Sequence, residues 1–205
     1  MGHLRRGAGR AVRRTSAAVA LAVLAAGCSQ GDGPGDPDRT QPASAALRVQ
    51  TVSGADQLDE GARAELEAAV GDVLSAYVVE AFLGDFPRQE FVASFQSFTS
   101  GVAASATRDI ETLTAASARD ATDVRATELD ARLSFLTRGD TVHAGTATVR
   151  FAFEATMEDG STRPLLLDGR IMLDAEGETW RIFGYDVRLD DGVAVDADLE
   201  TEDGS

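Results

Sequence analysis

Residues 129–189 read LDARLSFLTRGDTVHAGTATVRFAFEATMEDGSTRPLLLDGRIMLDAEGETWRIFGYDVRL, and this stretch decides the fold. Apolar and mostly polar residues alternate in four runs, the pattern of strands that bury one face. The apolar positions are Leu129, Ala131, Leu133 and Phe135, then Ala147, Val149, Phe151 and Phe153, then Leu165, Leu167, Ile171 and Leu173, and finally Phe183, Tyr185, Val187 and Leu189. Turn residues separate the runs at 138–140, 159–160 and 176–177. Such short links predict a four-stranded antiparallel meander.

Upstream of the strands the apolar spacing changes to steps of three and four, which indicates amphipathic helices. A first helix is expected over residues 59–83 and a third over residues 101–116. Between them, the apolar face of a second helix would consist of Phe91, Phe95 and Phe98. Residues 117–126 are interpreted as a polar connection to the first strand. The order of these elements predicts an α+β domain in which N-terminal helices pack on one face of a curved sheet.

Two glycines inside the strands, Gly169 and Gly184, are expected to mark bulges or sharp curvature. Helices followed by a curved meander resemble the nuclear-transport-factor-2-like cone fold, which includes polyketide cyclase-like and ketosteroid isomerase-like proteins. The phrase WRIFGYDV at residues 180–187 is similar to the last strand of many such domains, and the resemblance covers roughly residues 58–190. It implies a pocket between the helices and the concave sheet face, where the family's enzymes place a carboxylate and a tyrosine.

The N-terminal segment reads as a targeting signal. Five arginines precede an apolar run over residues 17–26, and small residues lead to Cys28 in the sequence Leu24-Ala25-Ala26-Gly27-Cys28. The run is too short for a membrane-spanning helix, which needs about 20 apolar residues. The segment resembles the signal peptide and lipobox of bacterial lipoproteins. That resemblance implies a lipidated, palmitate-bearing Cys28 at the mature N-terminus; the alternative is a secreted protein with a free thiol.

The chain therefore divides into four expected parts: a signal peptide over 1–27, a flexible tether over 28–46, the α+β domain over 47–190 and an acidic disordered tail over 191–205. Gly, Pro, Asp and Ser dominate the tether, and it offers little to bury. If Cys28 is lipidated, the domain stands on the extracytoplasmic face of the cell membrane.

Composition excludes several classes of function. The chain has 34 acidic residues and 19 basic ones, all of them arginine, for a net charge of −15. This charge disfavours nucleic acid as a partner. Without lysine there is no P-loop lysine, pyridoxal Schiff base or Ser-x-x-Lys site. His143 is the single histidine after Cys28, so the His-Glu-x-x-His zinc pattern is excluded, and neither a metal ligand nor a cofactor is predicted.

A candidate pocket is predicted from residues whose strand phases oppose the main apolar rows: Asp168, Arg170, Trp180 and Asp186. They have two interpretations. They line the pocket that the cone resemblance implies, or they lie on a solvated face and pair across strands. His143, near the Arg138-Gly139-Asp140 turn, has neither an orienting partner nor a nucleophile at a recognisable spacing, so no catalytic residue is predicted.

The sequence thus predicts a cell-envelope lipoprotein whose cone-like domain is a binding or assembly module. Its expected partners are the membrane, through Cys28, and an envelope protein or a small apolar ligand. The alternative is a small isomerase, cyclase or hydrolase that uses a pocket Asp or Tyr. An enclosed cavity with an inward carboxylate favours the enzyme, whereas a filled cone with an exposed apolar patch favours a protein partner.

Overall fold

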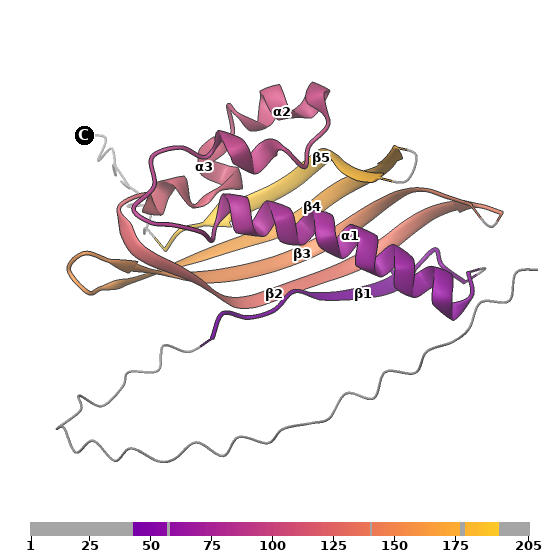
Figure 1. Ribbon diagram of the computed structural model, residues 1–205, viewed down its shortest axis with the longest axis horizontal. Coiled ribbons are helices and arrows are strands. Elements are labelled where there is room, and N and C mark those ends of the chain that lie inside the picture. Colours follow the sequence, from indigo (N-terminus) through magenta and orange to yellow (C-terminus); the bar gives the residue numbers. More distant parts are fainter. Residues whose placement is uncertain (1–42, 57, 140, 177–178, 193–205) are drawn as a thin grey trace, which may run out of the picture. The chain divides into compact units, whose positions relative to one another are not determined.

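A computed structural model describes residues 43–56, 58–139, 141–176 and 179–192 (Figure 1). Cys28, the expected signal peptide and most of the expected acidic tail lie outside these residues. The described chain forms a sheet with strand order β1-β2-β3-β4-β5 and a set of helices on one of its faces. The α+β class is therefore confirmed.

Four long strands form the expected antiparallel meander. Their bounds are β2 at Ala121–Arg138, β3 at Thr141–Met157, β4 at Thr162–Glu176 and β5 at Thr179–Asp190. Each pairs antiparallel with its sequence neighbour. The alternating apolar residues predicted for β2, β3 and β4 are buried, among them Leu133, Phe151 and Leu167 at 0–1% exposure.

The strand count of four is wrong, because β1 at Arg48–Ser53 adds a fifth strand that pairs parallel to β2. Its six residues alternate only weakly in burial, since it lies at the sheet edge. The interpretation of residues 117–126 as a connection is also wrong from Ala121 onward. There the register shifts between Ala126 and Glu128, and this bulge breaks the two-residue period that would have revealed the strand.

The first expected helix is confirmed as α1 at Glu60–Ala81. Asp59 caps it by accepting a 2.8 Å hydrogen bond from the backbone N–H of Ala62. The apolar stripe of α1 faces the sheet and buries Val70, Leu74, Tyr77, Val78 and Ala81. At its other side, Glu67 accepts a hydrogen bond from the Thr51 backbone N–H of β1, at 2.9 Å. The helix is thus fixed to both the core and the parallel edge strand.

The second and third helices differ from the prediction. The region forms the short elements η1 at Val92–Phe95, α2 at Ser100–Ala106, α3 at Ile110–Leu113 and η2 at Ala115–Ala118. Phe98 belongs to no helix, because Ile182 of β5 exchanges backbone hydrogen bonds with its neighbours Ser97 and Thr99. The expected third helix is interrupted where hydroxyl side chains bind nearby backbone, as Thr114 does with Ile110 and Ala116.

Aromatic side chains fill the space between the helices and the sheet. The Phe82 ring stacks on Phe153 at 4.4 Å, and Tyr77 meets Phe98 edge to face at 5.6 Å. The hydroxyl of fully buried Tyr77 donates to the Leu113 carbonyl at 2.6 Å. The described helices all lie on the same side of the sheet, which we call the inner face (Figure 1). The opposite side of the sheet, here called the outer face, carries the polar phase of the strands.

Candidate functional site on the outer face

A single row of alternating charge crosses the outer face. The register aligns one residue from each strand in the order Arg48, Asp130, Arg150, Asp168 and Arg188. Opposite charges on directly facing positions stabilise a sheet, whereas like charges would destabilise it. The row therefore follows from the strand register and unites β1 with the meander.

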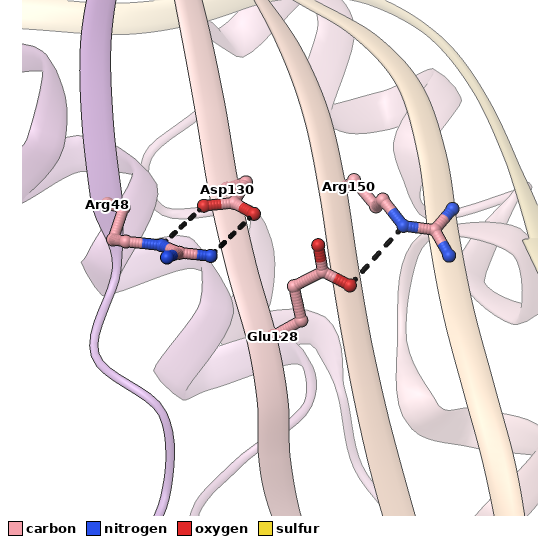
Figure 2. Close-up of polar contacts among 4 residues, drawn as sticks. All are labelled: Arg48, Glu128, Asp130 and Arg150. Atoms are coloured by element: carbon pink, nitrogen blue, oxygen red, sulfur yellow. Dashed lines mark hydrogen bonds and ion pairs between the residues drawn. The ribbon is translucent and has the colours of Figure 1, made fainter.

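An ion pair with two hydrogen bonds joins β1 to β2 (Figure 2). Nε and Nη2 of Arg48 donate to the two carboxylate oxygens of Asp130, at 2.7 and 2.9 Å. This fork holds the pKa of Asp130 below its usual range, because the hydrogen bond from Arg48 favours the ionised form. In Figure 2, Glu128 lies beside Asp130 and accepts from Nε of Arg150 at 3.3 Å.

Three of the four candidate pocket residues pair on this open face. Nη2 of Arg170 donates to Asp186 at 2.6 Å, and Arg188 lies 3.8 Å from Asp168. The Arg170 and Asp186 side chains are 62% and 66% exposed. This arrangement matches the second interpretation of these residues, a solvated face with pairs across strands.

The phase expected for Trp180 is wrong. Phe183 is an extra residue in β5, because Gly184 pairs with Met172 while Ile182 already pairs with Leu173. This bulge reverses the side-chain alternation, so Trp180 and Ile182 point to the inner face. The Trp180 ring lies 6.1 Å from the Phe135 ring, away from Asp186. Ile182 is buried, whereas Phe183, expected in the buried row, is 42% exposed.

The second part of the outer face is hollowed and carries exposed apolar side chains. Near the β2–β3 turn, one hollow of about 370 Å³ is lined by Ser134, Phe135, Leu136, Ala144, Gly145, Thr146 and Phe183. A second hollow of about 380 Å³ is lined by Leu136, Thr137, Arg138 and His143. Leu136 separates the two and is 66% exposed. We call Leu136, His143, Ala144 and Phe183 the tip patch.

Sequence reasoning missed the tip patch. Leu136 follows the apolar run of the first strand directly but lies out of its two-residue phase. An apolar residue at such an outward-facing position was the sequence signal that could have indicated an exposed apolar patch. His143 was placed correctly near a hairpin end, and in the structure it lines the second hollow. Nothing in the periodicity shows that Phe183 leaves the core, because a bulge is not visible in the spacing of apolar residues.

The inner face holds one tyrosine–carboxylate pair. The Tyr185 hydroxyl donates to Asp109, which lies between α2 and α3, at 2.6 Å. Burial, and next the hydrogen bond to Asp109, raise the pKa of Tyr185 to about 12. The hydroxyl therefore stays protonated near neutral pH and serves as a hydrogen-bond donor. Asp109 is exposed, so the pair lies at the border of the core rather than inside an enclosed pocket.

The described residues contain no candidate cluster of metal-ligating side chains and no candidate membrane-spanning helix. Within these ranges, no group of three His, Cys, Asp or Glu side chains is placed to hold a metal ion. No helix in the same ranges is long and apolar enough to cross a bilayer. In comparisons with known proteins, no family model, curated protein or solved structure matches this chain.

Proposed function

We propose that this protein is a lipid-anchored component of the cell envelope, held on the extracytoplasmic face of the membrane by Cys28, and that its α+β domain is a non-enzymatic binding or assembly module. In this proposal the domain is a nuclear-transport-factor-2-like cone. The observation that carries the module is the filled inner face combined with an open outer face that presents exposed apolar side chains.

The anchor is supported by the order of residues at the N-terminus. Arginines, an apolar run and small residues precede Cys28, which is the single cysteine of the chain. Two acyl chains on this cysteine would bury many methylene groups, at about 0.8 kcal/mol for each one. Such an anchor needs no membrane-spanning helix.

The module is supported by how the inner face is occupied. In an enzyme of the cone family, substrate would lie where Tyr77, Phe82, Phe98 and Phe153 pack against one another. These four side chains are at most 4% exposed. Well-packed aromatic contacts stabilise the domain and leave the outer face as the surface on which a partner can bind.

The enzyme alternative rests on Tyr185 and Asp109. Their hydrogen bond ties the α2–α3 connection to β5, which is a structural role. A tyrosine with a pKa of about 12 can donate a hydrogen bond to a developing oxyanion, so the pair is the place where catalysis would be sought.

Fractionation of producing cells tests the anchor. The wild-type chain should sediment with membranes, whereas Cys28→Ala should move to the soluble envelope fraction. Ser29→Ala is the matched control, since it alters the neighbouring position and leaves the cysteine. Full membrane retention of Cys28→Ala would overturn the anchor. Membrane release of both variants would show that the neighbourhood rather than the thiol matters.

A further inference from the structure

The tip patch combines two features. It is apolar and exposed, with Leu136 at 66% and Phe183 at 42% exposure. It is also hollowed on both sides of Leu136, by about 370 and 380 Å³. Exposed apolar side chains beside hollows are typical of surfaces that bind another protein.

Two independent bulges build this surface. His143 is an extra residue in β3, because Leu136 pairs with Ala144 while Thr137 pairs with Val142. Phe183 is the corresponding extra residue in β5. A bulge redirects a side chain, and both of these add one to the outer face at the same end of the sheet. Without the bulges neither side chain would join the surface around Leu136.

The arginines of the outer face divide into two kinds. Those with a carboxylate within 4.0 Å are Arg48, Arg125, Arg150, Arg170 and Arg188. Arg132 and Arg138 make no ion pair with any described residue, and both are exposed. On β2 they lie four residues before and two residues after Leu136. Arg132 and Arg138, which have no carboxylate partner among the described residues, thus flank the apolar centre.

We infer that the tip patch and its two flanking arginines form a docking surface for an extended segment of a partner protein in which apolar side chains stand between carboxylates. Arg132 and Arg138 are six residues apart on one strand, or about 20 Å. An extended segment of similar length would place an apolar side chain beside Leu136 and a carboxylate at each arginine. This inference rests on the proposed function of the domain as a binding module.

Charge and position favour this occupant over two others. A second copy of the chain would bring together two molecules of net charge −15 and face arginines with arginines. The membrane of the proposed anchor is also less suited. The described chain enters the sheet where Ala45 donates to the Ala126 carbonyl, and the strand from there to Arg138 extends for about 40 Å. The tip patch is therefore at the end of β2 remote from Ala45, where the described chain enters the sheet.

Selection from a display library of random short peptides tests the inference with the full chain as bait. The selected peptides should carry apolar residues flanked by Asp or Glu. Leu136→Ser combined with Phe183→Ser should weaken their binding about tenfold or more. Val92→Ser, which alters a side chain 62% exposed on η1, should leave binding unchanged. Arg132→Glu with Arg138→Glu should shift selection toward basic flanks, whereas Arg188→Glu should not.

Three outcomes would overturn the inference. Selected peptides could bind equally well to the Leu136 and Phe183 variant. Phosphatidylglycerol vesicles could bind Cys28→Ala in a Leu136-dependent way, which would assign the patch to a lipid surface. Concentration-dependent association that Leu136→Ser abolishes would assign it to a second copy. Fractionation of Cys28→Ala is independent of all three, so failure of the anchor and failure of this docking surface are distinguishable.

Discussion

Arg48 and Asp130 join two strands through a pair of parallel hydrogen bonds of 2.7 and 2.9 Å. They are directly opposed in the register of β1 and β2, the one parallel pairing among the described strands. A fork of this geometry fixes orientation as well as distance. Because β1 is short and lies at the sheet edge, this contact adds a side-chain link to its backbone pairing with β2.

The first prediction concerns the acidity of Asp130. Its pKa lies below the usual range because of the Arg48 hydrogen bond, so Arg48→Gln should raise it toward the ordinary value. Carbon-13 NMR of the carboxyl groups during an acid titration measures the change. A carboxyl with a lowered folded-state pKa stabilises the fold above its unfolded pKa and loses that stabilisation as pH falls through the folded value. Arg48→Gln should therefore lose less stability on acidification than the wild type.

Arg188→Gln is the matched control for this titration, because it removes an outer-face arginine three strands away from Asp130. An Asp130 titration that is the same in wild type and Arg48→Gln would show that the fork does not persist in solution.

The second prediction concerns the alkaline limit of stability. The pKa of Tyr185 rises to about 12 on folding, so its stabilising effect is complete below its unfolded pKa of about 10 and is lost as pH rises through 12. Tyr185→Phe should lower the free energy of unfolding by about 1 kcal/mol at neutral pH, through loss of the bond to Asp109. Thermal unfolding between pH 9 and 12, about the range set by these pKa values, measures both effects.

Tyr77 also contributes to the loss of stability at alkaline pH, because burial raises the pKa of its hydroxyl. Tyr185→Phe should thus reduce this loss of stability without abolishing it. Asp109→Asn keeps a hydrogen-bond acceptor for Tyr185 and removes the charge. It should therefore lower the free energy of unfolding at neutral pH by less than Tyr185→Phe does. Identical alkaline curves for the wild type and Tyr185→Phe would contradict the assignment.

Strict periodicity made most of the fold predictable. The apolar residues around Leu133, Phe151 and Leu167 recur mainly at every second position, and the α+β class and the meander follow from them. The helix α1 was predictable for the same reason, since its apolar stripe continues from Val70 to Ala81. Local pattern and tertiary packing agree in these elements.

The errors occur where a bulge or a tertiary contact replaces the local pattern. The bulge between Ala126 and Glu128 concealed the start of β2. The bulge at Phe183 moves Trp180 to the inner face, so its predicted place on the outer face was wrong. The helix expected around Phe95 and Phe98 gives way to a backbone bridge with Ile182. A bridge between segments so distant in sequence leaves no trace in local spacing. The places of His143 and Phe183 in the tip patch were unpredictable for the same reason, since both bulges are set by strand pairing.

The third prediction uses a glycine at a close approach of two strands. Gly169 of β4 has φ +144°, and a Cβ there would lie 2.3 Å from the Asp186 carbonyl oxygen and 2.7 Å from the Val187 Cα. Because both atoms belong to the backbone, Gly169→Ala must separate β4 from β5 and should cost about 3 kcal/mol of unfolding free energy. Chemical denaturation measures this loss.

Gly101→Ala is the opposite case and serves as the control. Gly101 lies in α2, and a Cβ added there would have no neighbouring atom within 4 Å, so alanine meets open space. The substitution should be neutral or stabilise the domain by about 0.5–1 kcal/mol, because alanine is the better helix former. Equal effects of the two substitutions would contradict the close approach at Gly169.

The last prediction tests the bulge that controls the face of Trp180. Deleting Phe183 removes the extra residue of β5, so the residues on one side of it must exchange faces. If the residues before the deletion exchange faces, Trp180 loses its contact with Phe135 and Ile182 is no longer buried. If the residues after it exchange faces, Tyr185 loses its hydrogen bond to Asp109. Either outcome should cost about 3 kcal/mol or more. Trp180 is the single tryptophan, so its fluorescence emission and acrylamide quenching report its environment.

Phe183→Ser keeps the bulge and should leave that emission close to the wild type. A deletion variant with wild-type stability and wild-type quenching would show that side-chain alternation in β5 does not depend on the bulge.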